Sequence, residues 1–285
     1  MHLKIRGLNA FAELVRLEHG LMYGIGVFVG AILSGWNLSF SSALLIGFLV
    51  SVLSEFGAFA LNDYFDVRAD TINRRRDRPI IRKDVSPDAA LLIGAASFIL
   101  ANLLAFMYLN QAAFLVVLAL TVLSVLYNTA LKHLPFIGNL FIAITMAVPF
   151  LFGGLVLGNI GQPAIFLSAI AFFVGVGREI MKDIEDVPGD RKVGARTLPI
   201  VIGAKWSARV SALCYIFAVL LSSVPFFSFF LGKVPYGLVL MTDVMLVEVA
   251  MRIWKNQDAR ILRWGRKQSL YAVAIGLVAF LLASL

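Results

Sequence analysis

Apolar runs of membrane-spanning length recur along this chain from Leu21 to its last residue, with short polar stretches between them. A helix needs about 20 predominantly apolar residues to cross the hydrocarbon core of a bilayer. The pattern therefore predicts an all-α membrane protein with nine transmembrane helices. The predicted spans cover residues 20–36, 41–61, 88–109, 112–131, 135–157, 162–181, 207–227, 234–252 and 268–285. The preceding stretch, which carries basic as well as apolar residues, is interpreted as an interfacial helix.

Composition and charge agree with this pattern. The 285 residues are 60% hydrophobic and have a mean hydropathy of +0.88, values that a water-soluble domain does not have. The net charge is +8, and in the nine-span arrangement all of the 25 Lys and Arg residues except Lys233 fall on one side of the membrane. This bias predicts a multi-pass cell-membrane protein whose N-terminus and basic loops are cytoplasmic. Anionic membrane lipids are the expected partners of these cations, and nucleic acid is not needed to explain them.

Two of the predicted cytoplasmic loops carry the same spacing of aspartates. The aspartates are Asp63, Asp66 and Asp70 in the first loop and Asp183, Asp186 and Asp190 in the second. Each residue of the second triplet lies 120 positions after its counterpart (183 minus 63), and the same displacement carries one Pro-Ile pair onto another. The pattern predicts a parallel internal repeat within a single transmembrane domain, residues 1–285, with motifs at 62–70 and 183–190.

The aspartate spacing has a chemical consequence. If each triplet continues the preceding helix, its three carboxylates lie within about 60° of one face. Two such charges about 6 Å apart repel by roughly 3 kcal/mol at an effective dielectric near 20. Mg²⁺ relieves such repulsion, because it binds a few carboxylates together with substrate phosphates. Arginines follow the first triplet, and guanidinium groups bind phosphate oxygens bidentately, although they can equally be topology anchors. We therefore expect a magnesium and diphosphate site.

Asn62-Asp63-x-x-Asp66-x-x-x-Asp70 and Asp183-x-x-Asp186-x-x-x-Asp190, in a nine-span chain, resemble the two aspartate-rich motifs of the UbiA family of intramembrane prenyltransferases. The resemblance implies a helical bundle around a central cavity that binds two Mg²⁺ ions and a prenyl diphosphate. The implied metal ligands are Asn62, Asp63, Asp66, Asp70, Asp183, Asp186 and Asp190, and Asp66, Asp70, Asp186 and Asp190 are the expected catalytic members. The expected diphosphate-binding side chains are Arg16, Arg74, Arg75, Arg78, Tyr127, Lys132 and Lys182.

The resemblance implies Mg²⁺-dependent transfer of a prenyl group, and the acceptor decides which reaction this is. The second loop is most similar to archaeal members that transfer geranylgeranyl to the free hydroxyl of geranylgeranylglyceryl phosphate, in ether-lipid synthesis. Six cations between residues 252 and 267 would suit such a phosphate-bearing acceptor. An aromatic acceptor of the 4-hydroxybenzoate or naphthoate type remains an alternative.

Two other classes of membrane protein are alternatives to a prenyltransferase. Glu55, Asp243 and Glu248 lie at membrane depth, where a charge costs about 3 kcal/mol, and a transporter would account for Asp243 and Glu248. We expect these three side chains to face the protein interior, with Asp243 either near the acceptor or in a neutral contact between helices. A membrane phosphotransferase also uses paired aspartates, but in a single stretch of sequence. The concentration of six aspartates in two loops favours the prenyltransferase.

Overall fold

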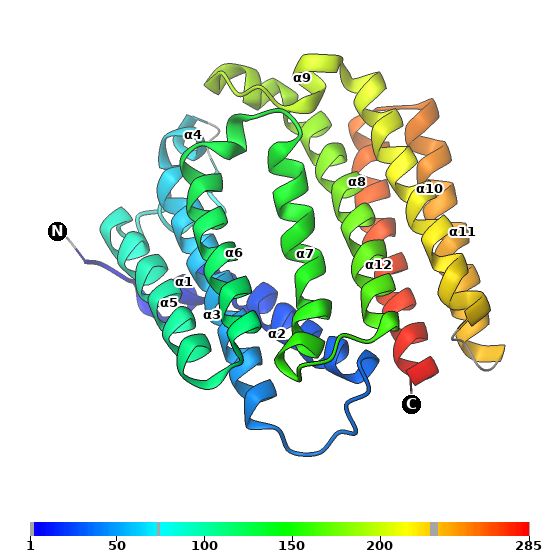
Figure 1. Ribbon diagram of the computed structural model, residues 1–285. Coiled ribbons are helices and arrows are strands. Elements are labelled where there is room, and N and C mark those ends of the chain that lie inside the picture. The colour runs from blue at the N-terminus through cyan, green and yellow to red at the C-terminus, as the bar shows by residue number, and fades with distance from the viewer. Residues whose placement is uncertain (1–2, 73–74, 229–232, 285) are drawn as a thin grey trace. The chain divides into compact units, whose positions relative to one another are not determined.

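The structure is a computed structural model that describes residues 3–72, 75–228 and 233–284, and within these ranges the long elements are all α-helices (Figure 1). An isolated antiparallel bridge joins Ile5 to Val85. The all-α prediction is confirmed. The helices are α1 (Gly7–Val15), α2 (Leu17–Leu33), α3 (Ser42–Phe65), α4 (Val67–Ile72), α5 (Pro87–Tyr108), α6 (Gln111–Thr129), the 3₁₀ turn η1 (Leu131–His133), α7 (Ile137–Val156), α8 (Gln162–Val193), α9 (Leu198–Ile202), α10 (Ala204–Ser228), α11 (Lys233–Lys255) and α12 (Ala259–Ser284).

Eight helices in the described part of the chain are long and apolar enough to span a membrane. A ninth candidate is the pair α1 and α2, which are bent by 52° relative to each other. The bend falls at Arg16, whose φ of 47° and ψ of 62° place it in the left-handed region. A separate helix before a first span at residues 20–36 was predicted, and the structure places the break earlier, at Arg16, with α2 beginning at Leu17. The eight later spans lie close to their predicted positions. Many large apolar side chains on these helices are exposed, as lipid-facing residues are expected to be.

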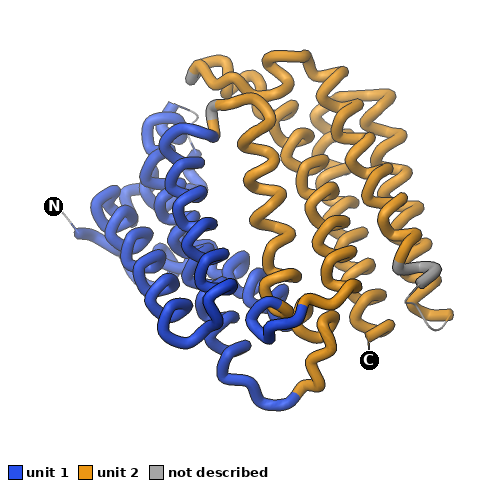
Figure 2. The backbone as a smooth tube through the Cα atoms, viewed as in Figure 1, with its two compact units in different colours: residues 1–28, 39–131, 155–159 blue, residues 29–38, 132–154, 160–285 orange. Residues whose placement is uncertain are grey.

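The chain forms two compact units, which Figure 2 distinguishes by colour. The first unit contains residues 1–28, 39–131 and 155–159, and the second contains residues 29–38, 132–154 and 160–285. In the first unit α3 packs against α1, α5 and α6. Its core near the first aspartate motif consists of small and branched side chains: Ala10, Leu14, Ala60, Ile80, Val85, Ala89 and Ala90. The predicted single domain with an internal repeat stays a prediction.

In the second unit α8, α10, α11 and α12 pack against one another and bury a large apolar cluster. Tyr215 of α10 is fully buried there, and a Cβ added at Gly177 of α8 would lie 3.0 Å from its ring. Gly30 is under a stricter constraint, because a Cβ there would lie 2.0 Å from the carbonyl oxygen of Phe150. Close helix packing at these points therefore depends on glycine.

The two aspartate motifs differ in backbone conformation. α8 continues past its apolar span through the whole second triplet and ends at Gly194, whose φ of 74° suits a glycine cap. α3 instead ends at Phe65, and Asp66, with φ of −89° and ψ of 0°, separates it from the short α4. A continuous carboxylate ridge on one helix therefore forms in the second motif, whereas in the first motif the ridge is interrupted.

Candidate active site in two aspartate motifs

Asp63 is the centre of an ion-pair cluster in the first motif. It lies near the end of α3, and its side chain is only 1% exposed. Arg78 donates to Asp63 Oδ1 over 2.9 Å, and Arg16 donates to the same oxygen over 3.4 Å. Asp63 Oδ2 is buried without a hydrogen-bond partner in the described residues. The carboxylate of Asp63 is thus engaged with two arginines that were both predicted to bind diphosphate.

The left-handed conformation at Arg16 brings this residue from the N-terminal helices to the first motif. Besides its contact with Asp63, the Arg16 guanidinium lies 4.1 Å from the centroid of the Phe59 ring, also on α3. A guanidinium over an aromatic face gains a cation–π interaction that holds the planar group in one orientation. The bend between α1 and α2 therefore has a role in the site, since it fixes where Arg16 points.

Asp70 lies on α4 close to the same cluster, with Arg78 Nε 3.7 Å from its Oδ2. Burial raises the pKa of Asp70 to about 6, and the neighbouring Asp66 charge acts in the same direction. Arg75 opposes this shift, but it is paired bidentately with Asp77 at 3.0 and 2.9 Å, and this hydrogen bonding lowers the pKa of Asp77. A divalent cation at this motif would favour the ionised form of Asp70.

Asn62 contacts α6 through a pair of amides. Its Nδ2 donates to Asn128 Oδ1 over 3.1 Å, and Asn128 in turn donates to the backbone carbonyl of Ser124 over 3.0 Å. Asn128 is buried, and sequence reasoning missed it in favour of its neighbour Tyr127. The sequence did contain an indication of this contact, because Asn128 is an amide at the end of an apolar span and a buried polar group needs a partner.

The remaining residues predicted to bind diphosphate have separate positions. Tyr127 is half-buried on α6, and Lys132 is half-buried in η1. Lys182 on α8 pairs with Glu179 at 3.3 Å. Arg74 lies outside the described residues.

The second motif forms a ridge along the last turns of α8. Asp183 accepts a hydrogen bond of 2.7 Å from Asn139 of α7, and Asp190 accepts one of 3.2 Å from Thr197. Asp186 lies between them and is exposed. Carboxylate oxygens in this arrangement suit a hard oxygen-seeking cation such as Mg²⁺. Sequence reasoning missed Asn139 and Thr197, which come from elements outside the motif.

The opposite side of α8 is attached to α12. Glu185 pairs with Arg266 at 2.8 Å and with Arg263 at 3.3 Å. Arg178 donates to the backbone carbonyl of Arg266 over 3.1 Å. Two of the six cations that the sequence offered for an acceptor phosphate are therefore bound to Glu185, and a third, Arg252, is bound to Glu248 at 2.7 Å. Within the described residues, no group of three or more His, Cys, Asp or Glu side chains comes together as a ready metal site.

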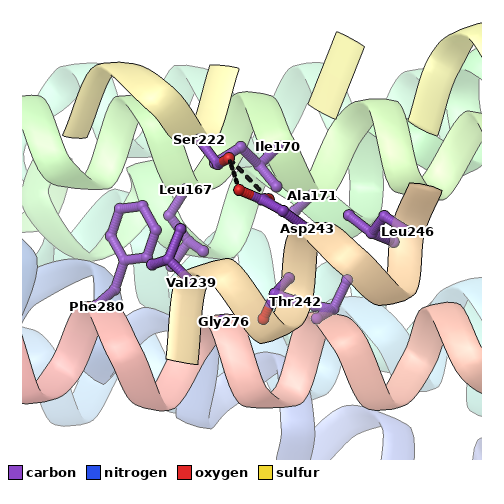
Figure 3. A pocket seen from close by; sticks show the side chains of 11 residues that line it. Leu167, Ile170, Ala171, Ser222, Val239, Thr242, Asp243, Leu246, Gly276 and Phe280 are labelled. Atoms are coloured by element: carbon purple, nitrogen blue, oxygen red, sulfur yellow. Dashed lines mark hydrogen bonds between the residues drawn. The ribbon is translucent and has the colours of Figure 1, made fainter. Parts of the chain in front are cut away.

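The acidic residues at membrane depth behave differently from one another. Asp243 of α11 lies beside a small pocket, and both its oxygens are within 2.8 and 2.9 Å of the Ser222 hydroxyl on α10 (Figure 3). Glu55 is buried on α3, as predicted. For Glu248 the prediction of an interior position is wrong, because its side chain is 43% exposed and pairs with Arg252 one turn along the same helix. Of the two roles expected for Asp243, its hydrogen bonds with Ser222 agree with a contact between helices, here α10 and α11.

Comparison with known proteins places this arrangement in a class of membrane-spanning enzymes. The model of the UbiA prenyltransferase family matches residues 23–271. A digeranylgeranylglyceryl phosphate synthase of Archaeoglobus fulgidus is 42% identical over 283 residues, which are 96% of this chain and 95% of that protein. The chain belongs to the UbiA prenyltransferase family and is a multi-pass membrane protein. The family prediction is confirmed.

Solved structures share the fold. One, described as a study of digeranylgeranylglyceryl phosphate synthase in membranes, superposes with a TM-score of 0.82 at 27% identity and covers 97% of this chain and 98% of its own. Another is a UbiA homologue from Archaeoglobus fulgidus bound to GPP and Mg²⁺, with a TM-score of 0.68, 17% identity and coverage of 95% and 99%. At that identity the second likeness shows the fold alone.

Proposed function

We propose that the protein transfers geranylgeranyl from its diphosphate to the free hydroxyl of geranylgeranylglyceryl phosphate, in a Mg²⁺-dependent step of membrane ether-lipid synthesis. The observation that carries this proposal is the similarity over 96% of the chain to a digeranylgeranylglyceryl phosphate synthase. The two aspartate motifs, each beside cationic side chains, support it. The distribution of Lys and Arg supports a cytoplasmic orientation of the N-terminus and of both motifs.

The predicted metal ligands fit Mg²⁺ chemically, because all of them donate oxygen. We assign the metal-binding role to Asn62, Asp63, Asp66 and Asp70 in the first motif and to Asp183, Asp186 and Asp190 in the second, with two ions in all. When bound, Mg²⁺ neutralises the charge that develops on the leaving diphosphate. A UbiA homologue of the same fold is bound to GPP and Mg²⁺, which supports magnesium as the metal.

The side chains around the motifs have their own tasks. Arg16 and Arg78 carry guanidinium donors for the diphosphate oxygens while Asp63 holds both in position. In the reaction the allylic carbon–oxygen bond breaks and its electron pair leaves with the diphosphate. The acceptor hydroxyl oxygen then forms the new ether bond, and its proton passes to the released diphosphate or to a nearby carboxylate. Water must be excluded during this step, because it would otherwise capture the allylic cation.

The test is product formation by the purified protein in detergent, with geranylgeranyl diphosphate as donor and a panel of acceptors. We expect ether formation with geranylgeranylglyceryl phosphate, loss with EDTA and recovery with Mg²⁺. Asp66→Asn and Asp186→Asn should each reduce turnover by roughly two orders of magnitude or more, because each removes a carboxylate that would hold the Mg²⁺ needed to neutralise the leaving diphosphate. The matched control is Glu248→Gln, a carboxylate outside both motifs, which should retain turnover. If 4-hydroxybenzoate is prenylated efficiently while geranylgeranylglyceryl phosphate does not react, the acceptor is aromatic and the lipid assignment is wrong.

A further inference from the structure

Arg209, near the start of α10, lies beside two tryptophans and has no acidic partner among the described residues. The Arg209 guanidinium is 4.4 Å from the Trp206 ring centroid and 5.2 Å from that of Trp254 on α11. Arg209 Nε is buried and has no hydrogen-bond partner, and no ion pair among the described residues includes Arg209. We call these three residues the Arg209 site. It lies outside both aspartate motifs.

Comparison with a second stacked arginine shows what the Arg209 site lacks. Arg252 also lies over an indole, 4.5 Å from the Trp264 ring centroid, but its guanidinium is paired with Glu248 at 2.7 Å. A partly buried guanidinium usually has an acceptor for its N–H groups, because five donors without partners are costly to desolvate. At the Arg209 site the guanidinium carbon lies over both indole rings, and no described acceptor contacts its terminal N–H groups, which leaves these groups for a ligand from outside the protein.

The geometry defines the chemistry of that ligand. A planar guanidinium edge binds phosphate oxygens bidentately, and stacking on aromatic faces fixes its orientation in advance. Lys205 precedes Trp206 and Lys255 follows Trp254 in the sequence, and neither lysine is in an ion pair within the described chain. Three cations without carboxylate partners at one end of the α10 and α11 pair therefore favour an anion.

The position of the site favours a lipid as the source of the anion. Trp206 is 59% exposed and Trp254 is 44% exposed, although both lie at the ends of helices that are long enough to span a membrane. Tryptophans concentrate at the level of the headgroups, where one part of the ring contacts apolar chains and another contacts water. A phosphate at this level belongs to a lipid headgroup, with the exposed indoles beside its glycerol and first methylene groups.

We propose that the Arg209 site binds the phosphate of an anionic membrane lipid. Arg209 supplies the bidentate contact, Trp206 and Trp254 hold its guanidinium and contact the lipid, and Lys205 and Lys255 add longer-range attraction. The site adds a binding function that does not depend on the proposed prenyl transfer, because it uses none of the motif residues.

The experiment is a lipid titration of the full-length protein in detergent, followed by native mass spectrometry, with dioleoyl phosphatidic acid as the probe and dioleoylglycerol as its uncharged counterpart. Arg209→Gln should weaken binding of phosphatidic acid roughly tenfold, since it removes a charge-assisted contact. The control is Arg263→Gln, which removes one charge from the same end of the unit while Glu185 keeps its pair with Arg266. Arg263→Gln should bind as the wild type does.

The outcomes separate the proposal from its alternatives. Retained binding in Arg209→Gln, or equal losses in both variants, would overturn it, because the attraction would then come from diffuse charge. Displacement of the lipid by an equal concentration of inorganic phosphate would overturn the assignment to a lipid headgroup. Arg209→Lys keeps the charge without the planar fork, so intermediate binding by this variant supports the bidentate contact.

Discussion

Replacing Asp63 by Asn tests whether this residue positions the arginines of the first motif. The substitution keeps the shape of the side chain and removes its charge. In the wild type that charge lies 2.9 Å from Arg78 and 3.4 Å from Arg16, and the three side chains are 1%, 17% and 25% exposed. Asp63→Asn therefore leaves two cations that are mostly buried without their shared counter-ion.

The magnitude follows from this burial. Removal of one partner from a buried ion pair costs about 3–5 kcal/mol, because the other charge remains desolvated. Two features lower the expected cost. Both arginines retain some contact with solvent, and the new amide oxygen can still accept from Arg78. We expect the free energy of unfolding to fall by about 2–3 kcal/mol.

The assay is thermal unfolding of the purified variants in detergent with EDTA present, so that no metal contributes. For a chain of this size the expected loss corresponds to a decrease in midpoint of roughly 5–10 °C. Asp186→Asn is the matched control, because the Asp186 side chain is exposed. It should unfold at the wild-type temperature while losing turnover. An Asp63→Asn protein as stable as the wild type would refute the positioning role, and so would an equal loss in both variants.

Two further predictions concern topology and packing. In a Cys214→Ser background, single cysteines that replace Arg196 and Gln257 should be labelled from the cytoplasmic side, and one that replaces Asn159 should not. Labelling of the first two positions from opposite sides of the membrane would contradict the predicted topology. Gly30→Ala should lower the thermal midpoint because its new methyl would lie 2.0 Å from a backbone carbonyl of α7, and an unchanged midpoint would mean that the helices separate at little cost.

Hydropathy was sufficient to predict most of the fold. Residues 135–157 were predicted as a span and α7 covers Ile137–Val156, because a run of apolar side chains of this length has few alternatives in a membrane. Hydropathy does not predict where a helix ends when the helix continues beyond its apolar span into polar sequence. α8 extends twelve residues beyond the predicted end at position 181, to Val193. The glycine at 194 was the available indication of where that helix ends.

The sequence pattern selects candidate residues for the site but does not show their contacts. Spacing alone identified the aspartates, since it repeats within the sequence. Their partners were not identified: Asn128 contacts a residue 66 positions away, and Asn139 contacts one 44 positions away. Such pairs are determined by how helices pack, which a local pattern does not contain. Arg75 differs from these residues, because its partner Asp77 is only two positions further along the chain.

The orientation of the second motif illustrates how packing prepares a site for chemistry. Successive residues of an α-helix are separated by about 100°, so Glu185 and Arg178 lie together on the side of α8 away from the aspartate ridge. Both are tied to Arg266 of α12, through the guanidinium and the backbone carbonyl respectively. On the other side Asn139 holds Asp183 from α7. Rotation of α8 about its axis would break contacts on both sides, so these side chains fix the direction of the carboxylates before any cation arrives. Because these carboxylates are already oriented, little side-chain conformational entropy is lost when the ridge binds metal and diphosphate.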